Sequence, residues 1–278
     1  MKKINRRSFL AAAGLTAAAL ALTACGGSAS STASSAASSA ASSEVASTSA
    51  AAELTTVEAG KLTMATNAAF PPYEMTTDAG EFEGIDIDTA KAIAEKLGLE
   101  LQIDDMDFDA ALLSVQQGKA DIVMAGVTVT DERKAVMDFS DSYATGIQSI
   151  IVPEGSDITS PDDLAGKKIG TQRGTTGYIY CSDDFGDDAV VAYDNGLTAV
   201  QALNNGQVDA VVIDNAPAKE FVAANPGLVI LDTSYAEEDY AIGLAKGSSL
   251  EDAVNAALEE LKADGTLQSI VDKYITAE

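Results

Sequence analysis

Short apolar runs alternate with amphipathic stretches along most of the chain after residue 60. In the amphipathic stretches, apolar residues recur at helical spacing. One stretch ends at Gly98, as is typical of a helix C-terminus, and another covers Phe108–Gln117. Strands that alternate with helices predict an α/β fold. The apolar runs of strand length are Lys61–Ala65, Leu99–Ile103, Ile122–Ala125, Gly146–Val152, Lys168–Thr171 and Asp239–Leu244.

One segment of the pattern occurs twice. Ser114–Gly126 (SVQQGKADIVMAG) resembles Ala202–Asp214 (ALNNGQVDAVVID). Each copy reads as the end of a helix, a glycine, an aspartate and a buried strand. Two copies of one βαβ-like unit predict two similar α/β lobes.

The first 24 residues predict a secretory leader. Its apolar part, Phe9–Leu22, is too short for a comfortable membrane span. Leu22–Cys25 resembles a bacterial lipobox, in which the cysteine is lipidated and becomes the new N-terminus. Arg6–Leu10 also resembles a twin-arginine signal, but paired basic residues occur in ordinary leaders, so the export route stays open. The basic residues of the leader are Lys2, Lys3, Arg6 and Arg7.

The segment from Gly26 to about Ala52 consists almost entirely of serine, alanine, threonine and glycine. Such a composition cannot bury a core and predicts a disordered tether. A flexible coil of this length reaches on the order of 30 Å. The tether would therefore hold a folded body close to a membrane.

The charge balance and the missing residue types exclude several functions. The chain has 43 acidic and 17 basic residues, and loss of the leader would leave 13 basic residues and a net charge of −30. Nucleic acids and anionic membrane surfaces need basic patches, so neither is an expected partner. The chain has no histidine, and its two cysteines, Cys25 and Cys181, do not suggest a disulfide framework or a zinc site. We therefore expect no metal and no cofactor, and an unpaired, partly buried Cys181.

The segment Gly118–Tyr143 contains a cation in an unusual place. After the predicted strand, Gly126 lets the backbone approach a neighbour closely, and Thr130 suits a helix N-cap. Arg133 would then lie in the first helical turn, where its charge opposes the helix dipole. A guanidinium beside the N–H groups of a helix start is a carboxylate site. On this segment alone, a surface arginine that pairs with a neighbouring acid is an equally good interpretation.

Four motifs together resemble the extracellular solute-binding proteins of ABC importers for polar amino acids. The resemblance extends from about Lys61 to Tyr274, although Thr89 stands where an aliphatic residue is usual. It implies a two-lobe, type II periplasmic-binding-protein-like fold, with a ligand cleft between lobes joined by two hinge strands. The motifs are Gly84–Asp88 (GIDID), Gly126–Arg133 (GVTVTDER), Asp138–Asp141 (DFSD) and Lys262–Leu267 (KADGTL).

The resemblance also implies a division of the chain. We expect a leader at residues 1–24, and the lipidated cysteine with its tether at 25–58. The first lobe would comprise residues 59–145 plus 237–278, and the second lobe residues 146–236.

The same resemblance implies a ligand site at the carboxyl ends of the strands. Arg133 resembles the arginine that grips the ligand α-carboxylate, and its planar fork suits a bidentate contact. Asp214 resembles the carboxylate that receives the α-ammonium group. The other implied contacts are Gly126 and Thr128 beside Arg133, Thr175 and Thr176 from the opposite lobe, and Phe70 and Phe108 around the ligand. Structural roles are the alternatives: a loop anchor for Phe70, core packing for Phe108, and helix or turn caps for Asp214, Thr175 and Thr176.

Two further positions in the implied site, Asn67 and Gln172, would decide specificity. Both are neutral, and a desolvated charged side chain between them would lack an opposite charge, which is costly. This favours an uncharged polar amino acid as the ligand. Glu74 or Asp107 could serve a cationic side chain instead.

The expected function is therefore capture of a polar amino acid and its delivery to an ABC permease with its ATPase. The protein would be a monomer, anchored through Cys25 on the extracellular face of a bacterial cell membrane, and not an enzyme. Two alternatives stay open. One is an enzyme on the same fold, such as a dehydratase that uses Glu74, Asp107 or Asp214. The other is a sensory or adhesive lipoprotein that binds a ligand without transport.

Overall fold

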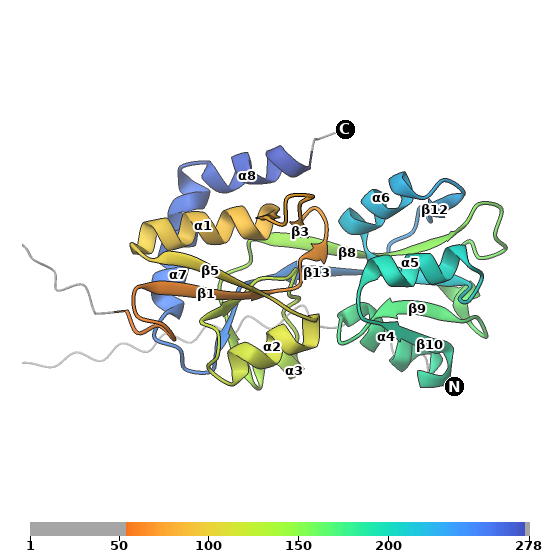
Figure 1. The fold of residues 1–278 in the computed structure, drawn as a ribbon. Coiled ribbons are helices and arrows are strands. Elements are labelled where there is room, and N and C mark those ends of the chain that lie inside the picture. The colour runs from red at the N-terminus through yellow and green to blue at the C-terminus, as the bar shows by residue number, and fades with distance from the viewer. Residues whose placement is uncertain (1–53, 276–278) are drawn as a thin grey trace, which may run out of the picture. The chain divides into compact units, whose positions relative to one another are not determined.

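The computed structural model describes residues 54–275, and Figure 1 shows how their helices and strands are arranged. The predicted leader, Cys25 and all but the last residues of the predicted tether lie outside the described residues. Within residues 54–275, no helix has the length and apolar character that crossing a membrane requires.

The first sheet has five strands in the order β5-β1-β6-β14-β7. β1 is parallel to both of its neighbours, whereas β14 is antiparallel to β6 and β7. In Figure 1, α1 and α8 lie on one side of this sheet and α2 lies on the other. The strands are β1 (Lys61–Thr66), β5 (Glu100–Asp105), β6 (Ile122–Val123), β7 (Met137–Phe139) and β14 (Gly243–Ala245). The helices are α1 (Ile85–Leu97), α2 (Phe108–Gln116), α3 (Asp131–Lys134), α7 (Glu251–Ala263) and α8 (Thr266–Tyr274). A small antiparallel sheet joins β2 (Ala69–Phe70), β3 (Glu74–Thr76) and β4 (Phe82–Glu83).

The second sheet has the order β10-β9-β11-β8-β12, and β13 also pairs with β8. β9 is parallel to β10 and β11, whereas β8 is antiparallel to β11, β12 and β13. The strands are β8 (Ala144–Pro153), β9 (Ile169–Gln172), β10 (Val190–Tyr193), β11 (Ala210–Asp214), β12 (Leu228–Ile230) and β13 (Ala236–Tyr240). The helices are α4 (Thr176–Phe185), α5 (Gly196–Asn204) and α6 (Asn215–Ala224), with 3-10 turns at Pro161–Leu164 and Asp187–Ala189.

The apolar residues of the central strands are buried on both faces. In β1, Leu62 and Met64 are fully buried in the core that includes α1, while Ala65 joins the core under α2. Each large apolar side chain so buried stabilises the fold by about 1.5–3 kcal/mol. The predicted α1 ends as expected, with Gly98 in the left-handed region at φ 69°. The α/β fold expected from the pattern is confirmed.

Three predicted elements are shorter or divided in the structure. The run Ile122–Ala125 forms ladder pairs only at Ile122–Val123, although all of it is buried. The helix that begins after Thr130 is a single turn of 4 residues. The predicted last strand, Asp239–Leu244, is divided because β13 pairs with β8 up to Tyr240, whereas β14 begins at Gly243 and pairs with β6 and β7.

The chain passes between the two sheets twice. It leaves the first sheet after β7 through β8, and it returns through β13 into β14. β13 pairs along its whole length with the first half of β8, from Ala144 opposite Tyr240 to Gln148 opposite Ala236, and Figure 1 shows both strands between the sheets. The expected lobe boundaries, at residues 145/146 and 236/237, fall within this strand pair.

The two copies of the repeated segment occupy equivalent positions. In each sheet the first strand of the unit, β1 or β9, lies between two parallel neighbours, and the strand of the copy is β6 or β11. The shared aspartates also act alike. Asp121 accepts hydrogen bonds from Val57 N and Thr63 N at 2.7 Å, and Asp209 accepts one from Lys168 N at 2.7 Å. Each aspartate therefore holds the start of the parallel strand beside it.

Candidate functional site

A pocket lies where the carboxyl ends of strands from both sheets meet. Asn67 follows β1, the loop with Gly126 follows β6, Gln172 ends β9 and Asp214 ends β11. Strand ends of this kind are where open α/β sheets bind ligands. The space between the pocket's atoms is about 400 Å³ when open solvent at its mouth is included, but only about 20 Å³ of it can hold the centre of a water molecule.

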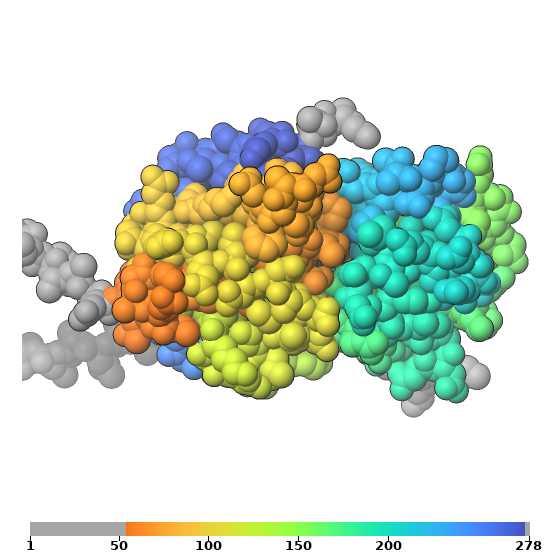
Figure 2. Space-filling view, viewed as in Figure 1, coloured from red at the N-terminus to blue at the C-terminus, as the bar shows by residue number. Residues whose placement is uncertain are grey.

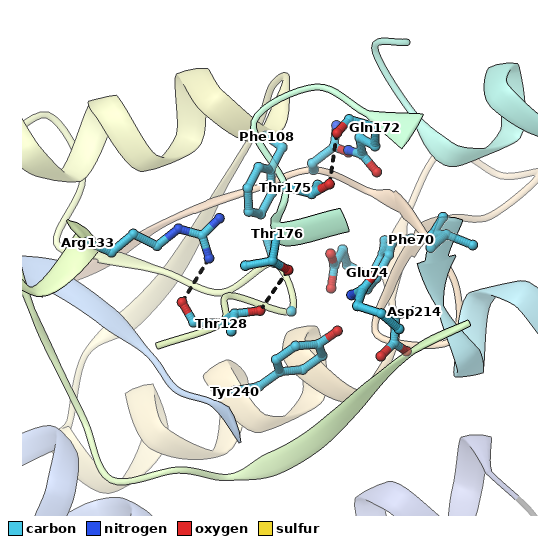
Figure 3. A pocket seen from close by; sticks show the side chains of 15 residues that line it. Phe70, Glu74, Phe108, Thr128, Arg133, Gln172, Thr175, Thr176, Asp214 and Tyr240 are labelled. Atoms are coloured by element: carbon cyan, nitrogen blue, oxygen red, sulfur yellow. Dashed lines mark hydrogen bonds between the residues drawn. The ribbon is translucent and has the colours of Figure 1, made fainter. Parts of the chain in front are cut away.

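All ten residues predicted from the sequence to bind the ligand line this pocket. Figure 3 shows most of them, with Arg133 and Asp214 on opposite sides. The other five lining residues are Glu74, which the sequence offered only as an alternative partner for a cationic side chain, and Ala125, Gln148, Ile213 and Tyr240, to which it gave no binding role.

Arg133 is a buried cation with a backbone-only set of hydrogen bonds. Arg133 is only 8% exposed. Its Nη1 donates a hydrogen bond to Thr128 O at 2.8 Å, and its Nη2 donates one to Gly174 O at 3.2 Å. The guanidinium carbon also lies 5.4 Å from the centre of the Phe108 ring. Among residues 54–275, no carboxylate forms an ion pair with it. Burial lowers the pKa of Arg133, although the negative charge of Glu238 opposes that shift.

The position of Arg133 follows from the local sequence. Thr130 caps α3, because its hydroxyl accepts a hydrogen bond from Arg133 N at 3.1 Å. The turn directs the side chain back towards the loop after β6, where it meets Thr128 O. Since α3 has only 4 residues, its dipole is small, and the guanidinium is the group here that can attract an anion. A buried cation without a counter-ion is costly, so the site is suited to a ligand carboxylate.

Asp214 is the buried anion on the other side of the pocket. Its Oδ1 accepts a hydrogen bond from Ala216 N at 3.0 Å, which caps α6, and its Oδ2 accepts one from Ile147 N of β8 at 2.8 Å. Burial raises the pKa of Asp214 to about 6, against the opposite effect of these bonds and of the Tyr240 hydroxyl. A cation placed here would stabilise the ionised form. Capping and pocket lining are therefore compatible roles for one residue.

Gly126 and the rings of Phe70 and Tyr240 form the wall next to Asp214, and Tyr73 packs against both rings. Gly126 has φ 55°, and a Cβ at this position would lie 2.8 Å from Phe70 and 3.2 Å from Tyr240. Only glycine readily adopts this positive φ and also lacks the Cβ that would collide with the two rings. The Phe70 ring stacks on Tyr73 at 5.8 Å between centres, and Tyr73 meets Tyr240 edge to face at 5.4 Å. Phe70 is thus both a loop anchor and a pocket residue, and Phe108 lies at the other end, against Arg133.

Several hydrogen bonds connect the two lobes directly around the pocket. Gln172 Nε2 donates to Asn67 Oδ1 at 2.9 Å, and Asn67 in turn donates to Met106 O at 2.9 Å. The hydroxyls of Thr128 and Thr176 lie 3.4 Å apart. In the space-filling view, residues coloured as the first sheet and as the second lie against each other on the visible face (Figure 2). Gln172 Oε1 remains buried without a partner among the described residues.

Glu238, which sequence reasoning missed, is the centre of this contact. Its Oε2 accepts hydrogen bonds from Thr128 Oγ1 at 3.1 Å, Thr176 Oγ1 at 3.0 Å and Gln148 Nε2 at 3.0 Å. Its donors come from both lobes and from the crossing strand β8. Thr175 differs from Thr176, because its hydroxyl donates to Gln172 O at 2.8 Å and caps α4. In the sequence, Glu238 lies one position before the predicted strand Asp239–Leu244, and no motif indicated a role for it.

Of the two acids considered for a cationic ligand, the structure places only one in the pocket. Glu74, on β3, is 1% exposed and lines the pocket, and its pKa is raised well above its ordinary value by burial and by Asp86. Asp107 is exposed at the N-cap position of α2 and does not line the pocket. The pocket is therefore lined by one guanidinium, Arg133, and by two carboxyl groups, Asp214 and Glu74.

Two α/β lobes that share a polar pocket at their strand ends are the architecture of the two-lobe solute-binding proteins. The chain belongs to the bacterial extracellular solute-binding proteins, family 3, whose family model matches residues 62–277. Both the expected fold and the expected family are thereby confirmed.

Named relatives and solved structures cover most of the chain. A probable histidine-binding protein of Neisseria gonorrhoeae is 33% identical over 283 residues, which cover 99% of this chain and 98% of the relative. A solved ancestral arginine-binding protein bound to glutamine is 43% identical, with a TM-score of 0.75, over 79% of this chain and 100% of that chain. An ancestral arginine-binding protein bound to arginine is 44% identical, with a TM-score of 0.74, over 78% and 98%. These relatives are described as binding proteins and not as enzymes, in agreement with a solute-binding role for this chain.

Proposed function

We propose that this protein captures a free α-amino acid with a polar side chain and presents it to the permease and ATPase of an ABC importer. The observation that carries the proposal is the buried Arg133 guanidinium, which has no carboxylate partner among the described residues. The buried Asp214 on the other side of the pocket, which forms no ion pair within residues 54–275, supplies the second half of the argument. An α-amino acid brings one carboxylate and one ammonium group, so it neutralises both.

The remaining end of the pocket would receive the ligand side chain. Asn67 and Gln172 are neutral hydrogen-bonding groups, which favours an amide or another uncharged polar side chain. Glu74 adds a carboxyl to the same pocket and favours a side chain with hydrogen-bond donors, including a cationic one. We therefore propose a donor-bearing side chain, with glutamine and arginine as the two test ligands. That ancestral arginine-binding relatives were solved with each of these amino acids supports the choice.

Capture would proceed by closure of the two lobes over the ligand. The direct bonds Gln172–Asn67, Arg133–Gly174 and Thr176–Glu238 are the contacts that closure would form. A ligand that contacts both lobes stabilises this form through its differential contacts. A micromolar Kd corresponds to about 8 kcal/mol, which two charged contacts in a dry pocket with aromatic packing can supply.

The proposed location is the outer face of the cell membrane. The lipobox at Leu22–Cys25 and the serine- and alanine-rich tether support a lipoprotein with a lipidated Cys25, which we propose to be a monomer. Mass spectrometry of the exported protein, with and without Cys25→Ser, tests the anchor. A diacylglyceryl mass on the wild-type N-terminus alone is the expected result.

The test of the ligand role is calorimetry of Arg133→Ala with arginine and glutamine. We expect affinity to fall by about 100-fold or more, since a charged hydrogen-bonded partner of the α-carboxylate is worth about 3 kcal/mol or more when it is removed from a buried pair. The matched control is Arg173→Ala, because Arg173 is exposed and does not line the pocket. Near-normal affinity in a folded Arg133→Ala protein would contradict the assignment of the carboxylate site.

A further inference from the structure

Two buried carboxyl groups meet behind the wall of the pocket. Glu74 lies on β3 and lines the pocket, and Asp86 lies in the first turn of α1, within the Gly84–Asp88 motif. Glu74 is 1% exposed and Asp86 is 0% exposed. The two residues lie on adjoining segments, because Tyr73 O accepts a hydrogen bond from Asp86 N at 2.9 Å, and each carboxyl affects the pKa of the other. Figure 3 shows Glu74 among the pocket side chains, on the side away from Arg133.

Each of these carboxyl groups has an oxygen that the described residues leave without a close hydrogen bond. They are Oε2 of Glu74 and Oδ1 of Asp86. The other oxygen of Asp86, Oδ2, accepts a hydrogen bond from Gly126 N at 3.0 Å. Buried polar atoms almost always have partners, and the Tyr143 hydroxyl beside Asp86 can supply only one donor to the pair. Two carboxyl groups can hydrogen-bond to each other only if one of them carries a proton.

The surroundings of the pair contain no compensating cation. Among residues 54–275, neither carboxyl forms an ion pair. Burial raises the pKa of Asp86 to about 6, and burial followed by the charge of Asp86 raises that of Glu74. Asp105 of β5 also raises the pKa of Glu74. The pair in turn raises the pKa values of Tyr73, beside β3, and Tyr143, before β8. None of them is a cation, so a proton is the nearest source of positive charge.

We propose that Glu74 and Asp86 together hold one proton in the ligand-free pocket, and that a ligand with a cationic side chain displaces this proton. Glu74 then contacts the ligand, and Asp86 is a specificity-determining residue that sets the charge Glu74 presents. The inference rests on the proposed amino-acid-binding function. In the exchange one O–H bond breaks, and the proton leaves to the buffer while the ligand cation takes its place. A ligand with a neutral side chain leaves the proton on the pair.

This arrangement explains how one pocket can accept both kinds of side chain. With the proton in place, the protonated carboxyl offers a donor and the other carboxyl accepts. Without the proton, the pair carries the full negative charge that a guanidinium needs. Proton exchange therefore avoids the cost of burying either an unpaired ligand cation or a doubly ionised carboxyl pair.

The test is calorimetry of the full-length chain with arginine and with glutamine, each in two buffers of different ionisation enthalpy, at pH 6 to 8. Asp214 faces the α-ammonium group of both ligands, so its own proton exchange is common to the two titrations. We expect arginine to release up to about one proton more than glutamine, and its affinity to rise by up to about tenfold per pH unit relative to that of glutamine.

Two variants and one control separate this role from a structural one. In Asp86→Asn the amide can donate to Glu74 while its oxygen accepts from Gly126 N, and in Glu74→Gln the amide can donate to Asp86. Either change removes the need for the proton, so the difference in proton release between arginine and glutamine should disappear. Glu95→Gln, at an exposed position of α1, should leave that difference unchanged.

The outcomes are distinguishable from failure of the proposed function. Equal proton release for the two ligands in the wild-type protein, with both binding normally, would overturn the carboxyl-pair inference and leave amino-acid binding intact. The carboxyl-pair inference also fails if a folded Asp86→Asn or Glu74→Gln protein keeps the wild-type difference. If the protein binds neither glutamine nor arginine nor any other amino acid, both proposals fail.

Discussion

The two equivalent strands, β6 and β11, lead to opposite charges at the pocket. In the first lobe, the chain leaves β6 through Gly126 and reaches Arg133. In the second lobe, β11 ends directly at Asp214, which caps α6. Equivalent strands in similar lobes thus bring a cation and an anion to one pocket. Such a pair is complementary to a zwitterion, which neither lobe could neutralise alone.

The lobes also differ in how their charged groups are held. Asp214 is fixed by backbone N–H groups of its own lobe and of β8. Arg133 is fixed partly by Gly174 O of the opposite lobe. The anion is therefore preformed in the second lobe, whereas the geometry of the cation depends on both lobes being together. We infer that the second lobe can hold a ligand ammonium group before closure, and that the carboxylate contact is completed by closure.

Among the substitutions that test this comparison, Asp214→Asn should have the largest effect, which is on ligand affinity. The amide oxygen can still cap α6 by accepting from Ala216 N, but the amide nitrogen cannot accept from Ile147 N, and the negative charge proposed to face the α-ammonium group is lost. We expect affinity for arginine and glutamine to fall by about 100-fold, or about 3 kcal/mol. Calorimetry measures the change, with Asp187→Asn, an exposed residue of the same lobe, as the control. A loss of less than fivefold would mean that Asp214 only caps the helix.

A second test compares the two repeated aspartates through stability. Asp121 is 5% exposed and accepts two backbone hydrogen bonds, whereas Asp209 is exposed and accepts one. We expect Asp121→Ala to lower the free energy of unfolding by about 2–3 kcal/mol and Asp209→Ala by about 1 kcal/mol or less. Urea unfolding followed by circular dichroism measures both. Equal losses would show that the first lobe does not depend more on its aspartate than the second.

The smallest expected effect is on the pH dependence of stability. Each lobe buries one aspartate whose pKa is raised to about 6, Asp86 in the first and Asp214 in the second. Between about pH 4, the ordinary range of an unfolded aspartate, and about pH 6, the folded state binds more protons than the unfolded state. Stability should therefore fall as pH rises through this window.

Thermal melts from pH 4 to 7 measure that slope in the ligand-free protein. Asp86→Asn and Asp214→Asn should each flatten it, and Glu95→Gln should not. Because the strongly acidic chain also repels itself more as pH rises, the difference between variant and wild type is the relevant quantity. A wild-type slope that both substitutions leave unchanged would contradict the raised pKa values.

Much of the fold, and the importance of Arg133 in the site, could be predicted because they depend on patterns that are local in sequence. The helix that ends at Gly98, the cap at Thr130 and the repeated strand units each depend on a short pattern. Arg133 attracted attention because its charge opposes a helix start. The resemblance to the family then supplied Asp214, Asn67 and Gln172, and the structure brings all of them to one pocket.

The residues that escaped prediction depend on contacts between distant segments. Glu238 acquires its role because β13 crosses beside β8, so that its carboxylate meets Thr128 and Thr176 from separate lobes. Tyr240 reaches the pocket through the same crossing. Glu74 was weighed only as an alternative, because no pattern showed that Asp86, 12 positions further along the chain, would lie against it.

The position of β14 has a consequence for the order in which the chain can fold. β14 lies between β6 and β7 in the first sheet. β7 can therefore join this sheet only after residues 243–245, which form β14, have been synthesised. During synthesis, all strands from β8 to β12 precede this point. The second lobe can therefore assemble its central sheet while the first lobe, which begins earlier in the chain, still lacks an interior strand. In this protein the lobe that starts first is the lobe that finishes last.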